Sequence, residues 1–123
     1  MSVKNKKQFG IWMDAQEATI IGRETTGTFV VLGHEKFKSQ GSNSNENASN
    51  NAERTLQTKY FKEIASHMPN VDELHVTGTG QVQEQFIRFM AETPQFKHTA
   101  SQQCTSNKMS DEKLLSFFTE KFG

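Results

Sequence analysis

The hydrophobic pattern of this chain changes its period near residue 52, and this change limits the folds that the chain can adopt. Before residue 52, bulky residues alternate with polar ones over short stretches. In the segment 8–14, for example, Phe9, Ile11 and Met13 fall on one face of a strand and Trp12 falls on the other. After residue 52, bulky residues recur every three or four positions, which is the period of a helix with one buried face. The sequence therefore predicts strands first, and helices interleaved with strands afterwards.

The expected elements follow from this pattern and from the turn residues between them. Strands are expected at 8–14, 17–22, 26–39, 72–77 and 97–105, and helices over 52–68, around 82–90 and from Ser110 or Asp111 to the end. Three short strands with brief connections favour an antiparallel meander, and the later strands are joined through helices. We therefore predict an α/β fold, in the order β-β-β-α-β-α-β-α, with helices packed on a single mixed five-stranded sheet. The polar segment 97–105 is expected at the edge of that sheet.

One domain spanning residues 1–123 is expected, interrupted by a segment of unusual composition. Residues 40–51 (QGSNSNENASNN) contain no large apolar side chain. Such a segment cannot bury enough surface to offset the entropy lost on ordering, so it is predicted to be a flexible loop. Long loops inside compact domains often carry function, and an unconstrained insertion is the alternative.

Charge and cysteine content limit the partners and the compartment. Lysine plus arginine and aspartate plus glutamate number 14 each, so a nucleic acid would have to be bound by a local basic patch. The single cysteine, Cys104, cannot form an internal disulfide, and no apolar run is long enough to cross a bilayer. A cytoplasmic protein without membrane contact is expected. Cys104 is predicted to be a free structural thiol, because no adjacent histidine or helix N-terminus is evident from the sequence to activate it.

Several short sequence patterns occur in an order and at spacings that are more specific together than each is alone. A strand pair of the form hydrophobic-Asp-x-x-x-Ala-hydrophobic spans 11–20, a basic strand end leads into the long segment, and a helix bearing Arg54 follows. A strand then runs into Gly78-Thr79-Gly80, with Phe86 beyond it, and the segment 105–112 (TSNKMSDE) opens the last helix. Together these patterns resemble the middle domain of archaeal and eukaryotic class-1 peptide-chain release factors and of the related Pelota ribosome-rescue proteins. The resemblance runs from about residue 11 to residue 121 and implies an RNase H-like sheet and a ribosome-related role.

The chain departs from the release-factor pattern at its reactive tripeptide. Release factors carry Gly-Gly-Gln at the tip of the central loop, whereas the equivalent stretch here is Lys38-Ser39-Gln40-Gly41-Ser42. Two successive glycines permit backbone conformations closed to residues with a Cβ, which Ser39 and Gln40 do not reproduce. Pelota-type middle domains also lack the tripeptide. The resemblance therefore favours a non-catalytic protein that binds the ribosome or a structured RNA, with no cofactor and no metal.

The candidate RNA- or ribosome-binding residues surround the third strand, the loop and the first helix. They are Arg23, Lys36, Lys38, Gln40, Arg54, Lys59 and Lys62. The turn Gly78-Thr79-Gly80, at a strand-to-helix junction, is a candidate anion-binding turn, since backbone N–H groups at a helix N-terminus attract phosphate. An ordinary solvated surface and a plain tight turn are the alternative interpretations of these two features.

Two other functions fit the same residues. A polar edge strand at 97–105 would let the chain form a homo-oligomer or bind another protein. A metal-dependent nuclease would use Asp14 with Glu53 or Glu63, but the fourth strand ends in Thr77-Gly78 without the further carboxylate that such enzymes need. A phosphoesterase would use Asp14, Glu17 and the turn Gly78-Thr79-Gly80. Asp14 is also explained as a turn residue. Trp12 is expected to pack in the core under a helix.

Overall fold

The computed structural model describes residues 7–24, 27–37, 49–69 and 71–122, and for residues 24, 49–55 and 95 it describes the backbone alone. Five strands form one mixed sheet in the order β3-β2-β1-β4-β5. Their bounds are β1 Lys7–Met13, β2 Glu17–Glu24, β3 Val30–Lys36, β4 Glu73–Gly78 and β5 Ala100–Thr105. β1, β2 and β3 pair antiparallel, whereas β4 pairs parallel with both β1 and β5. The predicted α/β fold with a mixed five-stranded sheet is confirmed, and β5 lies at the edge as expected.

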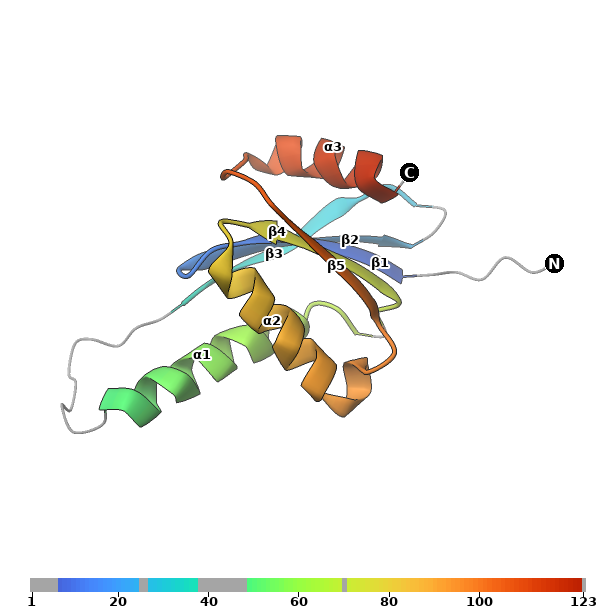
Figure 1. Ribbon diagram of the computed structural model, residues 1–123. Coiled ribbons are helices and arrows are strands. Elements are labelled where there is room, and N and C mark those ends of the chain that lie inside the picture. The colour runs from blue at the N-terminus through green and yellow to red at the C-terminus, as the bar shows by residue number, and fades with distance from the viewer. Residues whose placement is uncertain (1–6, 25–26, 38–48, 70, 123) are drawn as a thin grey trace.

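Three α-helices cover the two faces of the sheet unequally (Figure 1). α1 (Ser49–Ala65) and α2 (Gln81–Glu92) lie on one face, and α3 (Asp111–Phe122) lies alone on the other. A 3₁₀ turn, η2 (Pro94–Phe96), joins α2 to β5. The element order is the predicted one. Among the described residues, no helix is long and apolar enough to cross a membrane.

Several element boundaries differ from the sequence prediction; β3, for example, ends at Lys36 rather than near 39, and α1 ends at Ala65 rather than at 68. α1 begins at Ser49, so it includes residues 49–51 of the segment expected to be a loop, while residues 40–48 lie outside the described residues. β3 begins at Val30 rather than at 26. β5 begins at Ala100 rather than at 97, because the turn that follows η2 occupies residues 97–99. β2 continues two residues past the predicted end, since Arg23 and Glu24 still pair with β1.

The alternation along β1 divides the core in two, as predicted. Phe9, Ile11 and Met13 pack with the helices α1 and α2, and Trp12 packs under α3. The predicted stripe of α1 is confirmed from Tyr60 to Met68, since Tyr60, Phe61, Ile64, Ala65 and Met68 are all buried, whereas Leu56 is only half-buried.

Candidate functional site

The carboxyl ends of the parallel strands β1, β4 and β5 meet at one edge of the sheet, which is where ligands bind in open α/β sheets. Three connections gather there: the β1–β2 hairpin at 14–16, the β4–α2 turn at 78–80 and the start of the β5–α3 connection at 106–108. We call these residues, which lie where the parallel strands end, the carboxyl edge; the term does not refer to the outermost strands β3 and β5. The backbone N–H of Phe37 donates to the carbonyl of Gln16 at 2.7 Å, so the chain also leaves β3 beside the hairpin. The segment expected to be a functional loop therefore follows directly from this edge.

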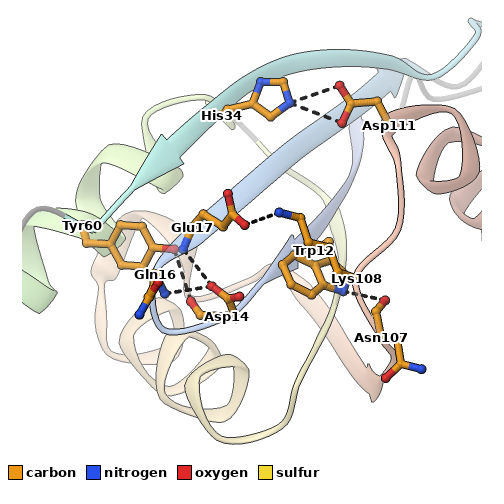
Figure 2. Close-up of polar contacts among 9 residues, drawn as sticks. All are labelled: Trp12, Asp14, Gln16, Glu17, His34, Tyr60, Asn107, Lys108 and Asp111. Atoms are coloured by element: carbon orange, nitrogen blue, oxygen red, sulfur yellow. Dashed lines mark hydrogen bonds and ion pairs between the residues drawn. The ribbon is translucent and has the colours of Figure 1, made fainter.

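Asp14 organises the hairpin of the carboxyl edge (Figure 2). Its Oδ1 accepts the backbone N–H groups of Gln16 and Glu17, each at 2.8 Å, which is the turn role predicted from the sequence. The buried Tyr60 of α1 donates its hydroxyl to the carbonyl of Asp14 at 3.3 Å. Burial, followed by the negative charges of Asp14, Glu17 and Glu35, raises the pKa of the Tyr60 phenol. Tyr60 therefore stays protonated and ties α1 to the hairpin.

The β5–α3 connection is held against the strands by polar contacts from successive residues. Trp12 Nε1 donates to the carbonyl of Asn107 at 3.1 Å, and the ammonium of Lys108 pairs with the carboxylate of Glu17. The hydrogen bond to Glu17 is the main reason that the pKa of Lys108 is raised. Three residues after Lys108, the carboxylate of Asp111 at the start of α3 lies 3.1 Å from His34 of β3. These contacts fix the carboxyl edge on the α3 side.

The candidate anion-binding turn requires both of its glycines. A Cβ on Gly78 would lie 1.9 Å from the carbonyl oxygen of Met13, and Gly80 has a φ of 133°, which side-chain-bearing residues rarely adopt. The N–H of Gly80 already donates to Oε1 of the buried Gln83 at 2.9 Å, and the amide nitrogen of Gln83 donates in turn to the carbonyl of Cys104. One of the N–H groups that would face an anion is thus used within the protein, and Thr79 remains exposed.

The structure brings together some of the candidate cations and separates another. The rings of Phe37 and Tyr60 are in contact, with centroids 5.6 Å apart, so the end of β3 lies beside α1. Lys36 pairs opposite Glu17, which binds Lys108, so Lys36 lies on the α3 face of the sheet, whereas Lys59 lies on α1. Lys62 lies one turn further along α1, and all three lysines are exposed.

Arg23 lies at the far end of β2, where its Nε donates to Gln8 at 2.9 Å and its guanidinium covers the ring of Phe29 at 4.4 Å. Lys38 and Gln40 lie outside the described residues, and the side chain of Arg54 is not described.

A histidine beside Cys104 was missed by the sequence analysis. His75 Nε2 lies 3.2 Å from Cys104 Sγ, and Thr77 Oγ1 lies 3.3 Å from the same sulfur. Cys104 is a free cysteine, as predicted, but it has the histidine neighbour that was not evident from the sequence. β4 and β5 pair in parallel with Thr77 opposite Cys104, which sets His75 diagonally across from the cysteine on the same face. Burial lowers the pKa of His75, and the charge of Lys121 lowers it further. Only the register of the two strands would have revealed the pair.

Among the side chains that the structure describes, the carboxylates proposed for a nuclease do not form a metal site. In the part of the chain that the structure describes, no three or more histidine, cysteine, aspartate or glutamate residues are placed to share a metal ion. Asp14 is engaged with the hairpin and Glu17 with Lys108. The side chain of Glu53 is not described.

Sequence comparison identifies no relatives, because no family model matches the chain and no curated protein is similar to it. Comparison of structures identifies proteins with a similar fold. The Pelota protein of Thermoplasma acidophilum superposes with a TM-score of 0.62 at 17% identity, covering 94% of this chain. Pelota of Archaeoglobus fulgidus superposes with a TM-score of 0.62 at 12% identity, and the archaeal translation termination factor aRF1 with 0.59 at 14%. This chain folds like a domain of Pelota and aRF1. It matches 32% to 34% of those chains, so it spans about a third of their length.

Proposed function

We propose that this chain is a non-catalytic, translation-related protein that binds the ribosome or a structured RNA. The observation that carries the proposal is the Pelota- and aRF1-like fold, which extends over 94% to 96% of the chain. One of the matching proteins is a translation termination factor. The sequence lacks Gly-Gly-Gln, so the proposed action is occupancy of a site and not peptide release.

The surface proposed to contact RNA carries Lys59 and Lys62 on α1 and Lys36 at the adjoining end of β3, where Lys36 lies on the other face of the sheet. We call these three residues the lysine corner. Its three side chains are exposed, and it adjoins the carboxyl edge and the start of the segment 38–48. Phosphate contacts from exposed lysines position a protein on RNA without reading its sequence. Lys38, Gln40 and Arg54 are proposed to extend this surface, while Arg23 would make a separate contact. The Gly78-Thr79-Gly80 turn is proposed to hold one phosphate, through the N–H groups that Gln83 does not occupy.

A charge-matched pair of triple variants tests the lysine corner. We expect the variant K36Q/K59Q/K62Q to lose co-sedimentation with ribosomes purified from the source cell. The salt dependence of any remaining binding should fall by roughly one unit of log–log slope for each phosphate group that the variant no longer neutralises. The control R88Q/K97Q/K113Q removes the same charge from exposed residues elsewhere and should bind like the wild type.

Equal co-sedimentation of both triple variants would refute the lysine corner, provided that both unfold at the wild-type temperature. A second variant that adds K38Q and R54Q tests whether the surface continues beyond the described residues. Binding that disappears only in this second variant would place the contact on the segment 38–54 instead.

A second candidate function is self-association through β5. This edge strand carries no charge and no proline, and all of its residues except Cys104 are exposed. Edge strands are usually protected by charges, prolines or bulges, so an unprotected one is open to pairing with another copy. Light scattering at increasing concentration tests this: a dimer that Q103K abolishes supports pairing through β5, and a monomer at all concentrations excludes it.

A further inference from the structure

Four polar side chains lie together on β4 and β5, on the face of the sheet that α3 covers. The parallel register sets His75 opposite Gln102 and Thr77 opposite Cys104. Residues two apart on a strand point to the same face, and the ring of His75 contacts two phenylalanine rings of α3. All four side chains therefore face α3. They are not part of the lysine corner, and no role in the proposed function rests on them.

The thiol of Cys104 has two polar neighbours. His75 Nε2 lies 3.2 Å from Sγ, and Thr77 Oγ1 lies 3.3 Å from it. The hydroxyl of Thr77 in turn lies 2.7 Å from the hydroxyl of Ser106. A thiolate is the reactive form of cysteine and accepts hydrogen bonds, so an imidazolium N–H and a threonine O–H at these positions would both stabilise Sγ once it has lost its proton.

His75 is in the protonation state that can take up this proton. It is 5% accessible, and burial, followed by the charge of Lys121 on α3, lowers its pKa, so the imidazole is neutral at neutral pH. A hydrogen bond with the side chain of Gln102 acts in the opposite direction and raises the pKa, as expected where an imidazole donates to an amide oxygen. His75 is thus a neutral base whose protonated form also has a partner.

The position of Cys104 favours a small reagent. The residue is half-buried and lies on β5, the last strand of the sheet in the described part of the chain, so a small molecule can reach the sulfur while α3 lies close by. Hydrogen peroxide is such a reagent, and its reaction with a thiolate needs a proton for the departing oxygen, which an imidazolium supplies. Cys104 is the only cysteine of the chain, so its oxidation cannot end in an internal disulfide.

We propose that Cys104 is a peroxide-reactive thiol and that His75 first accepts its proton and then returns it. The Sγ proton passes to Nε2 of His75, and the thiolate attacks one oxygen of hydrogen peroxide. An S–O bond forms and the O–O bond breaks, so the sulfur loses two electrons and the peroxide gains them. The departing oxygen takes the proton from the imidazolium and leaves as water. Cys104 becomes a sulfenic acid, and His75 is neutral again. The reaction requires neither ribosome binding nor pairing through β5.

The test follows sulfenic acid formation in the full-length protein by dimedone trapping and mass spectrometry during treatment with hydrogen peroxide. A thiol that shares one proton with an imidazole keeps a constant fraction of the thiolate–imidazolium form between the two pKa values of the pair. We therefore expect the wild-type rate to fall by roughly threefold or less from pH 7.5 to 6.5, whereas an isolated thiol loses about tenfold per pH unit below its pKa.

Matched variants isolate the part played by His75. H75F keeps a ring against α3 but cannot exchange a proton, so its rate at pH 7 should be about tenfold or more below that of the wild type. With iodoacetamide the loss in H75F should be smaller, because iodide leaves without a proton. H98F removes an exposed histidine and should react like the wild type, and C104S should form no adduct.

The wild-type protein and a second variant keep the test decisive if the melting temperature shows that H75F does not fold. T77V removes the other donor to the thiolate and should slow the reaction while the weak pH dependence remains. A wild-type rate that falls about tenfold per pH unit, or that does not exceed the rate of the urea-unfolded chain, overturns the proposal. Equal losses in folded H75F with peroxide and with iodoacetamide also overturn it, because His75 would then not return the proton.

Discussion

The two faces of the sheet are filled in different ways. On the face under α1 and α2, seventeen of the described buried residues form one apolar cluster, which includes the edge-to-face pair Phe61–Phe86 at 5.3 Å. On the face under α3, five buried residues form the cluster, and the helix is also held by polar contacts at Asn107, Lys108 and Asp111. Bulk apolar contact stabilises the first layer, whereas close approach and a few directional contacts position the second.

Gly10 shows how close that approach is. A Cβ at this position would lie 2.5 Å from ring atoms of Phe118, so the ring of α3 rests directly on the backbone of β1. We expect the α1–α2 layer to determine whether the domain folds, and the α3 layer to respond locally to change. The four predictions that follow test this difference.

The largest effect is expected from F86A in the α1–α2 layer. Phe86 is fully buried against Phe61 and Phe89, and its removal leaves a cavity that the rigid layer cannot fill. The free energy of unfolding in urea should fall by about 3–5 kcal/mol. F89A, at a partly buried position of the same helix, is the control and should lower the free energy of unfolding by less. A larger effect in F89A than in F86A would contradict the assignment of Phe86 to the centre of this layer.

G10A should act on the α3 layer alone. The added methyl group collides with the Phe118 ring, so α3 must move, at a cost of about 1–3 kcal/mol. Hydrogen exchange measured by mass spectrometry should show faster exchange in α3 and unchanged exchange in α1 and α2.

The control for G10A is the same change in an F118A background. There it should lower the free energy of unfolding much less, because the ring that the added methyl group would meet is absent. Equal costs in both backgrounds, or faster exchange throughout the domain, would mean that the two layers are not separable.

His75 is expected to make the α3 layer sensitive to acid. Its pKa is lowered in the folded protein by burial and by Lys121, so below about pH 6.5 the unfolded chain binds a proton that the folded chain resists. Stability should therefore fall as the pH drops through the range between the unfolded and the folded pKa, and level off below it. H75F, which keeps a ring against Phe117 and Phe118, should show a weaker dependence than the wild type between pH 7.5 and 5.

The exposed His98 supplies the control for the acid effect. H98F should keep the wild-type pH dependence in the same urea titrations, because this side chain is not buried. An H75F profile parallel to the wild-type profile would remove His75 as the cause.

The smallest effect is expected from K108A. The ammonium of Lys108 is exposed, so water and salt screen its pairing with Glu17. The melting temperature should change little, and less at high salt than at low salt. A double-mutant cycle with E17A measures the coupling. A coupling that survives high salt would show that this contact does more to hold α3 than its exposure suggests.

Much of this architecture was predictable because it depends on local periodicity. The alternation around Trp12 assigned the two faces of β1, and the stripe from Tyr60 to Met68 identified the buried side of α1. Ser110 was expected near the start of α3, and its hydroxyl accepts the N–H of Lys113 at 3.3 Å. The turn role of Asp14 followed from its place between two strands. In each case, residues close together in the chain decide the structure.

The candidate sites were less predictable because they depend on strand register. His75 and Cys104 are 29 residues apart and meet only through the parallel pairing of β4 with β5. A cavity beside β3 likewise brings Lys7, Leu32 and Pro69 together from three parts of the chain. Arg23 was grouped with the cations of the first helix, yet it lies at the other end of β2, where it pairs opposite Gln8. Sequence spacing alone does not contain these distances.

Trp12 gives the molecule a built-in optical reporter. It is the only tryptophan of the chain, it is 2% accessible, and its indole nitrogen is bonded to the connection that leads into α3. Detachment of α3 would expose the indole to water and shift its emission to longer wavelengths, even if α1 and α2 remained packed on the other face. Intrinsic fluorescence therefore reports on the α3 side of the sheet. If the unfolding transition measured by fluorescence differed from the one measured by far-ultraviolet circular dichroism, a form of the domain with only α3 detached would be populated.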